Sequence, residues 1–233
     1  PRTGAIHPKR WTCWATIAKL SNMFTWPFFL AVGFALLDWA STWKGWKKRL
    51  YVAKPATLLF MILWTLMLTR WQGDMKWYGI ALVFSLAGDI LLMLNPRYFL
   101  YGLAAFFLTH VFYLVAMNQT PAEVNFFVML IAVLVGIVAA RVLRMLRPGI
   151  LKAPKGRRML VATTVYAAAL ALMVLSALLT FFRPGWPLQA AIFVSIGALL
   201  FFISDSTLTY DRFVRKLNHG QSLVHLTYHL GQF

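Results

Sequence analysis

Residues 187–209 read PLQAAIFVSIGALLFFISDSTLT, a run of 23 residues in which Asp205 is the only charged side chain. An α-helix rises about 1.5 Å per residue, so a run of this length crosses the roughly 30 Å hydrocarbon core of a bilayer. An ionised carboxylate inside that core costs at least ~2.5–3.5 kcal/mol, so it is expected to face the interior of a helix bundle and to have a partner. The stretch therefore predicts a transmembrane helix with a buried acidic residue.

The composition of the whole chain agrees with this interpretation. Of 233 residues, 61% are hydrophobic and only 12% are charged, and the mean hydropathy is +0.69. A soluble domain is about half apolar and about a quarter charged. The composition excludes a disordered chain, a small disulfide-stabilised secreted fold and an ordinary water-soluble enzyme. The single cysteine, Cys13, also excludes an intrachain disulfide and a cysteine-based zinc site.

Apolar runs recur along the chain, and each is predicted to be a helix because backbone groups in lipid must be hydrogen-bonded within their own element. The runs are 24–43, 55–71, 77–94, 98–117, 124–143, 159–182, 187–209 and 223–233. The predicted fold is therefore all-α and polytopic, with about eight transmembrane helices in one domain over residues 23–233. Residues 1–22 combine tryptophan with lysine and arginine and are predicted to be a basic segment at the membrane interface.

Positive charge is concentrated between the apolar runs. The chain has 23 Lys and Arg against 6 Asp and Glu. If the spans alternate, sixteen of these bases fall on one side of the membrane and seven on the side of the N-terminus. Such asymmetry is typical of membrane proteins that follow the positive-inside rule and contact anionic headgroups, rather than of nucleic-acid binding. The basic side is therefore predicted to be cytoplasmic. The expected partners are membrane lipids. The short loops favour a bacterial plasma membrane.

Two acidic residues lie well inside predicted spans. Asp89 lies six residues before Asn95, and Asp205 lies six residues before Asp211, so each is ~9 Å from the basic side at 1.5 Å per residue. Two carboxyls in one poorly solvated pocket would differ in pKa, so that one acts as a general acid and the other as a general base. The remaining acids are predicted to lie at span ends, in water: Asp38, Asp74, Glu123 and Asp211.

Other spans place polar side chains at about the same level. These side chains are Lys54, Tyr166, His225 and Tyr228. The last run has a polar stripe at helical spacing, formed by Gln221, His225, Tyr228, His229 and Gln232. Such a stripe must face protein or a wet cavity. Ala81, Ser85 and Gly88 give the third span a small-residue face beside Asp89, which allows close approach of a neighbouring helix.

A weak internal repeat relates the third and fourth spans to the seventh and eighth. Asp89 precedes the motif HVFY (110–113) by 21 residues, and Asp205 precedes the motif HLTY (225–228) by 20. Such a repeat predicts parallel 4+4 halves about an axis along the membrane normal. It would gather two carboxylates and two His/Tyr pairs around a central pocket.

The motifs in the sequence are consistent with acid–base hydrolysis and with two alternatives. The chain has no G-x-S-x-G and no H-E-x-x-H, so serine and zincin-type hydrolases have no support. His225 and His229 have a metal-capable spacing, and His110 as a third ligand would make a zinc-dependent lipid amidase or esterase, although ordinary hydrogen bonding is favoured for this pair. The second alternative is a non-enzymatic proton-coupled transporter that uses the carboxylates as a relay.

Five motifs together, in order and at these spacings, resemble the YhhN-like lysoplasmalogenase family, from about Lys54 to the end of the chain. They are KP at 54–55, SLAGDILLML at 85–94, GLAAFFLTHVFY at 102–113, GALLFFISDSTLTYDRF at 197–213 and LTYHLGQ at 226–232.

The resemblance implies an eight-helix membrane enzyme that hydrolyses the vinyl ether bond of a lysophospholipid substrate, the lysoplasmalogen. The products would be a fatty aldehyde and glycerophospho-ethanolamine or -choline. The acidic positions of the family fall on Asp89 and Asp205, the candidate catalytic residues. The candidate substrate-binding residues are Lys54, His110, Tyr113, Tyr166, Tyr228 and His229. No metal or other cofactor is expected.

Overall fold

The structure is a computed structural model that describes residues 25–233, and within that range it contains α-helices and no β-strand. The helices are α2 (Trp26–Lys44), α3 (Lys47–Thr69), α4 (Met75–Met93), α5 (Phe99–Met117), α6 (Phe126–Lys152), α7 (Gly156–Leu178), α8 (Leu188–Phe213) and α9 (Gly220–Gln232). Two 3₁₀ turns, η3 (Pro96–Tyr98) and η4 (Leu179–Phe182), precede α5 and follow α7. The all-α prediction is confirmed, while the predicted interfacial segment at 1–22 lies outside the described residues.

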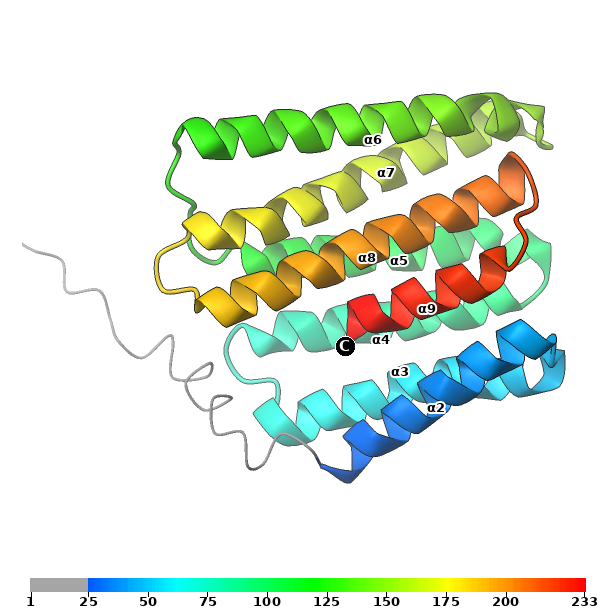
Figure 1. Cartoon of the computed structure of the whole chain (residues 1–233), viewed down its shortest axis with the longest axis horizontal. Helices are drawn as coiled ribbons and strands as arrows, with labels where there is room; N and C mark the ends of the chain where they lie inside the picture. The colour runs from blue at the N-terminus through cyan, green and yellow to red at the C-terminus, as the bar shows by residue number, and fades with distance from the viewer. Residues whose placement is uncertain (1–24) are drawn as a thin grey trace, which may run out of the picture.

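The helices form an up-and-down bundle in which successive helices are joined at alternating ends (Figure 1). Helix α6 lies at one edge of the bundle, and α9 ends about half-way along it. Six helices, α3 to α8, are long and apolar enough to cross a membrane. The shorter α9 and the N-terminal α2 pack against each other within the same bundle. The chain is therefore an integral membrane protein.

Two helix boundaries differ from the predicted ones by eight residues or more, and the others by four or fewer. Helix α3 begins at Lys47, so Pro55 lies inside the helix rather than at its start. Proline removes the hydrogen bond to the carbonyl of Tyr51, and this residue is 56% exposed near the basic end of the bundle, where polar groups can replace that bond. Helix α6 continues to Lys152, beyond the predicted end at 143, because its exposed arginines can extend toward the headgroups.

Small residues set the spacing of α4 and α5. The predicted small-residue face of α4, formed by Ala81, Ser85 and Gly88, is buried. A Cβ atom added to Gly88 would lie 2.6 Å from the ring of Phe106 on α5. In lipid, helices associate through close packing rather than through a hydrophobic driving force, so this contact holds the helix of Asp89 against its neighbour.

Helix α6 is the least buried of the long helices. Only Val128, Leu146 and Ile150 are buried among its 27 residues. It packs against α7 and α8, and most of its apolar side chains face outward. An apolar surface of this kind is expected to contact acyl chains, so α6 shields one side of α7 and α8 from the bilayer.

Candidate functional site

Asp89 lies at the centre of a buried polar cluster. Its side chain on α4 is fully buried, and Nζ of Lys54 on α3 lies 2.9 Å from Oδ1. The hydroxyl of Tyr228 on α9 donates a hydrogen bond of 2.9 Å to Oδ2. Lys54 therefore pairs with a carboxylate of the protein inside the bundle.

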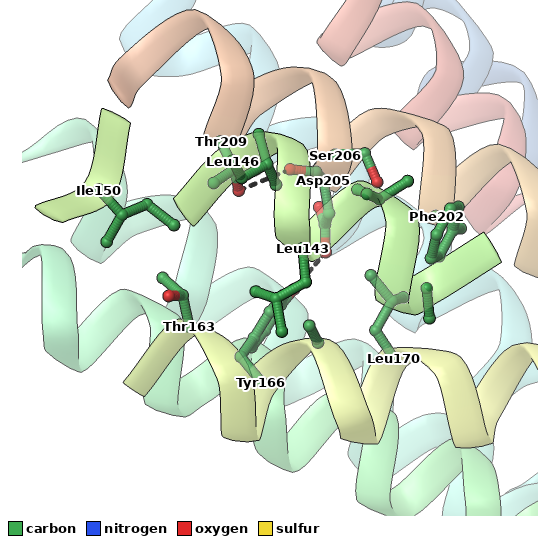
Figure 2. A pocket seen from close by; sticks show the side chains of 13 residues that line it. Leu143, Leu146, Ile150, Thr163, Tyr166, Leu170, Phe202, Asp205, Ser206 and Thr209 are labelled. Carbon is green, nitrogen blue, oxygen red and sulfur yellow. Dashed lines mark hydrogen bonds between the residues drawn. The ribbon is translucent and has the colours of Figure 1, made fainter. Parts of the chain in front are cut away.

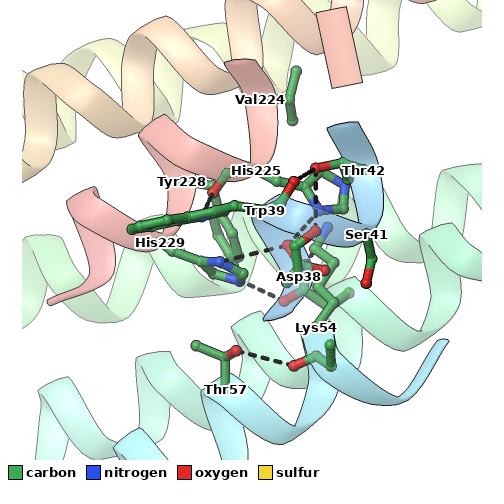
Figure 3. Close-up of polar contacts among 12 residues, drawn as sticks. Asp38, Trp39, Ser41, Thr42, Lys54, Thr57, Val224, His225, Tyr228 and His229 are labelled. Atoms are coloured by element: carbon green, nitrogen blue, oxygen red, sulfur yellow. Dashed lines mark hydrogen bonds and ion pairs between the residues drawn. The ribbon is translucent and has the colours of Figure 1, made fainter. Parts of the chain in front are cut away.

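Asp38 belongs to the same cluster, which corrects the prediction that it lies in water at a span end. Its side chain on α2 is fully buried, and Oδ2 accepts a hydrogen bond of 2.7 Å from Nδ1 of His225. Nδ1 of His229 lies 3.6 Å from the same oxygen (Figure 3). The sequence did contain a signal, because the buried residues Ala31, Ala35 and Asp38 follow helical spacing on one face of α2.

We call the group formed by Asp38, Lys54, Asp89, His225, Tyr228 and His229 the Asp38–Asp89 cluster. An ionised Asp38 can only accept, so with Asp38 ionised the bond to His225 places a proton on Nδ1 of this histidine. His229 is fully buried, and neither of its ring nitrogens has a hydrogen-bond partner within residues 25–233. Two carboxylates against one lysine leave a negative charge unbalanced, and burial makes such a charge costly. We therefore expect one additional proton on this cluster.

Asp205 forms a second centre with two other predicted residues. The hydroxyl of Tyr166 on α7 donates a hydrogen bond to Oδ2 of Asp205. Nε2 of His110 on α5 lies 2.9 Å from the Tyr166 oxygen and 3.6 Å from the same carboxylate oxygen. Since the single hydroxyl proton of Tyr166 points to Asp205, Nε2 of His110 must hold the proton that it donates to Tyr166.

A narrow crevice between α6, α7 and α8 borders the Asp205 centre (Figure 2). Its volume is about 30 Å³, which is room for about one water molecule. Its polar lining consists of Thr163, Tyr166, Asp205, Ser206 and Thr209. Its apolar lining consists of Ala139, Val142, Leu143, Leu146, Ile150, Ala167, Leu170 and Phe202. Asp205 is therefore a buried carboxylate that a water molecule in the crevice can reach.

The two centres are neighbours but do not share a hollow. The Tyr228 ring, which belongs to the Asp38–Asp89 cluster, packs 5.4 Å from the ring of Phe201, and that ring packs 5.0 Å from the ring of His110. Within the described part of the chain, no hydrogen bond or ion pair joins Asp89 to Asp205, and Asp89 does not line the crevice. The prediction of one hollow between the two carboxylates is therefore wrong, because Phe201 fills the space between Tyr228 and His110.

Tyr113, another predicted binding residue, contacts neither carboxylate. Its hydroxyl donates a hydrogen bond of 2.6 Å to Oε1 of Gln232, and Nε2 of Gln232 donates one of 2.9 Å to Ser85. These bonds join α5 and α4 to α9. They confirm that the polar stripe of α9 faces protein.

Asp211 is the second acid whose predicted exposure is wrong. Its side chain is buried near the end of α8 and accepts hydrogen bonds of 2.8 Å from Nζ of Lys216 and from the backbone N–H of Leu217. Gln221 donates a third bond of 3.3 Å. The carboxylate closes the turn from α8 to α9, and Glu123, in contrast, is exposed as predicted.

The three histidines of the alternative zinc site lie in different places. His110 belongs to the Asp205 centre, whereas His225 and His229 belong to the Asp38–Asp89 cluster. In the structure as described from residue 25 onward, no group of three His, Cys, Asp or Glu side chains is placed to hold a metal ion. The three-histidine arrangement is therefore not formed.

The two motifs of the predicted repeat pair crosswise. His110 of the first motif lies at Asp205 of the second, and Tyr228 of the second donates to Asp89 of the first. The equivalence ends there, because His225 pairs with Asp38 and not with an acid of the repeat. The 4+4 relation between the two halves stays a prediction.

Comparison with known proteins finds relatives along most of the chain. Lysoplasmalogenase TMEM86B of Sus scrofa is 33% identical over 152 residues, which are 65% of this chain and 58% of the pig protein. Lysoplasmalogenase TMEM86B of Mus musculus is 29% identical over 217 residues, which cover 88% of this chain and 81% of the mouse protein. The membrane protein YhhN of Escherichia coli O157:H7 is 28% identical over 204 residues, which are 82% and 85% of the two chains. No solved structure matches the chain.

The sequence profile of the YhhN family matches residues 50–233. The matched part contains both aspartates of the predicted pair, together with Lys54, His110, Tyr166 and Tyr228. Asp38 lies outside it, on the helix that precedes the match. Since the matched part is more than half of the chain, the chain belongs to the YhhN family.

Proposed function

We propose that this membrane protein is a hydrolase that cleaves the vinyl ether bond of lysoplasmalogens. The products would be a fatty aldehyde and glycerophospho-ethanolamine or -choline. Two of the relatives described above are named lysoplasmalogenases, which supports such a function at the level of the family. The observation that supports the chemistry is the carboxylate of Asp205, held by Tyr166 at the edge of a crevice with room for about one water molecule.

In the proposed mechanism, Asp205 acts first as an acid and then as a base. Its protonated carboxyl gives a proton to the vinyl carbon that is not bonded to oxygen, and an oxocarbenium ion forms. A water molecule in the crevice adds to the carbon bonded to oxygen while the Asp205 carboxylate takes its proton. The hemiacetal then collapses to the aldehyde and the free glycerol hydroxyl, so one water is consumed overall. Tyr166 and His110 orient the carboxylate throughout.

Asp89 is proposed to support this reaction from the neighbouring centre. Both of its oxygens are occupied, one by Lys54 and one by Tyr228. Tyr228 in turn packs on Phe201, which forms one side of the space around His110. We therefore assign Asp89 as a positioning residue that fixes Tyr228 and Phe201, whereas Asp205 contacts the substrate. His229 and Lys54 are proposed to help hold Tyr228 and Phe201 in place.

The proposed location is the plasma membrane of a bacterium, with the basic end of the bundle toward the cytoplasm. The short turns between helices support this location, as does the alignment of the Escherichia coli protein over 82% of the chain. A lysophospholipid would then be taken from the cytoplasmic leaflet, with its phosphate near the exposed arginines of that end.

The test measures aldehyde release by the purified protein from an alkenyl lysophosphatidylethanolamine. The control lipid has a saturated ether at the same position. The wild type is expected to release aldehyde only from the alkenyl lipid. Asp205→Asn is expected to lower kcat by about 100-fold or more, because a positioned general acid contributes roughly 10²–10⁴-fold. Tyr166→Phe is expected to lower kcat about tenfold, the effect of ~1.4 kcal/mol in the barrier.

Two further variants separate the roles of the acids. Asp89→Asn is expected to reduce kcat less than Asp205→Asn does and to change KM as well. Glu123→Gln replaces an exposed carboxylate by an amide and is expected to leave the rate unchanged. An inactive wild type would sink the proposed function, and full activity in Asp205→Asn would sink the proposed mechanism.

A further inference from the structure

The crevice beside Asp205 changes from polar to apolar along the membrane normal. Helix α8 runs toward the basic end, so Thr209 lies nearer that end than Asp205, and Phe202 lies deeper. Helix α7 runs away from the basic end, so Thr163 lies nearer that end and Leu170 lies deeper. On α7 and α8, the hydroxyls and the carboxylate thus line the half of the crevice nearer the basic end. Apolar side chains line the deeper half.

The third wall of the crevice is α6, and its lining residues are apolar. Leu143 lies across from Asp205 and Tyr166 (Figure 2). Ala139 is the lining residue of α6 farthest from the basic end. A lysolipid has the same order of groups, with a charged headgroup, a glycerol and ether region, and then a hydrocarbon chain. Exposed bases at the basic end of the three helices match its phosphate: Arg144, Arg147, Arg157 and Arg212.

Helix α6 has its buried residues near its two ends and is only partly buried in between. No residue between Val128 and Leu146 is buried. Near the basic end, a Cβ atom added to Gly149 would lie 2.3 Å from the carbonyl oxygen of Phe213, so α6 and α8 are in close backbone contact there. The middle of α6 is therefore the part of the wall that can move away from α7 and α8 most easily.

Moving this part of α6 aside is energetically modest in a bilayer. The crevice of about 30 Å³ holds a water molecule but not a hydrocarbon chain, so a chain can enter only by replacing contacts of α6. Lipid tails are as apolar as leucine, so the exchange replaces one apolar contact by another. The entering chain would then fill the space that α6 leaves.

We propose that the crevice between α6, α7 and α8 is the subsite for the hydrocarbon chain of the lysolipid, and that Ala139 limits the chain length it accepts. The chain enters from the bilayer as the middle of α6 moves outward, and it lies along Leu143, Leu170 and Phe202. The identity of the lipid rests on the proposed function, but the presence of a chain subsite does not.

The experiment measures binding rather than turnover. Saturated 1-O-alkyl lysophosphatidylethanolamines with butyl, decyl and octadecyl chains have no vinyl ether to hydrolyse, so their binding can be measured by itself. Ala139 lies one helical turn, ~6 Å, deeper than Leu143, so a butyl chain ends near Ala139 and the two longer chains pass it. The Kd values of the three lipids are determined by native mass spectrometry for the wild type, Ala139→Phe and Ala140→Phe. Ala140 is the matched control, because it is the next residue of α6, is exposed, and does not line the crevice. Thermal unfolding in detergent verifies that both variants are folded, and Ala139→Leu replaces Ala139→Phe if the larger ring prevents folding.

Ala139→Phe is expected to raise the Kd of the decyl and octadecyl lipids about tenfold and to change that of the butyl lipid by no more than about twofold. Ala140→Phe is expected to change none of the three by more than about twofold. Equal Kd values in the two variants, for every chain length, would overturn the subsite. If Ala139→Phe weakens binding as expected but the wild type releases no aldehyde, the proposed function is overturned and the subsite stands.

Discussion

Asp38 joins the N-terminal helix of the bundle to the last one through a single buried hydrogen bond to His225. Replacing it by alanine leaves the Nδ1 proton of His225 without an acceptor in a place that water does not reach. Leaving a buried donor without an acceptor costs about 1–3 kcal/mol, and more when the group is charged. We therefore predict that Asp38→Ala lowers the free energy of unfolding by about 3 kcal/mol. The measurement is chemical unfolding of the purified protein in detergent.

Asp74→Ala is the control for this prediction. Asp74 is half-buried at the start of α4, and its side chain caps no backbone N–H of that helix. A substitution away from buried pairs changes stability by about 0.5 kcal/mol or less. Equal losses in the two variants would show that the buried bond of Asp38 contributes nothing particular.

At this scale, the cost of burying charge in lipid was a sufficient guide to Asp89 and Asp205 but not to Asp38. The position of Asp38 near the end of an apolar run predicts that it lies in water. Its burial depends instead on the helix packed against it, and the polar stripe of α9 lies there. Likewise, no local pattern shows that Phe201 lies between Tyr228 and His110, because that contact depends on how three helices pack.

Among the elements, α9 depends most on its neighbours. It has only 13 residues, and an isolated helix of that length is marginal. Its backbone contacts that of α8 closely, since a Cβ atom added to Gly197 would lie 2.8 Å from the carbonyl oxygen of Gly231. Overpacking costs about 1–3 kcal/mol. Gly197→Ala is therefore predicted to lower the free energy of unfolding by about 2 kcal/mol and to reduce activity, because α9 positions Tyr228.

Gly136→Ala provides the matched comparison. Gly136 lies within α6, and an added Cβ atom would meet nothing within 4 Å. Alanine is favoured over glycine inside a helix by up to ~1 kcal/mol, so this variant should be as stable as the wild type or slightly more so. Unfolding curves in detergent provide the comparison, and a Gly197→Ala protein as stable as Gly136→Ala would contradict the close packing of α8 on α9.

The apolar runs predicted every helix of the described bundle, but they predicted the ends of α3 and α6 poorly. An apolar run ends at the first charged residues, whereas a helix continues until its backbone groups form other hydrogen bonds. Helix α3 therefore starts among the lysines at 47–48, and α6 continues past Arg144 and Arg147. The side chains of these residues can extend into the headgroup region while the backbone stays helical.

For the whole molecule, the structure changes the number of Lys and Arg side chains at each end that can contact lipid headgroups and so determine the orientation in the membrane. Lys54 is buried in an ion pair with Asp89, and Arg183 is buried and donates to the carbonyls of Met117 and Thr120. Neither side chain is available to headgroups. Among the described residues, this leaves fifteen bases at the basic end (16 − 1) and two, Arg70 and Lys76, at the other (3 − 1). The asymmetry becomes stronger, so the basic end is still predicted to be cytoplasmic.

Cysteine labelling in intact bacterial cells tests this orientation. Cys13, the one native cysteine, is first replaced by serine. Asn218→Cys then places an exposed thiol in the turn between α8 and α9, at the basic end, and Glu123→Cys places one in the loop between α5 and α6, at the opposite end. A membrane-impermeant maleimide is expected to label Glu123→Cys in intact cells and Asn218→Cys only after permeabilisation. The reverse pattern would put the basic end outside, and the crevice beside Asp205 would then draw its lipid from the outer leaflet.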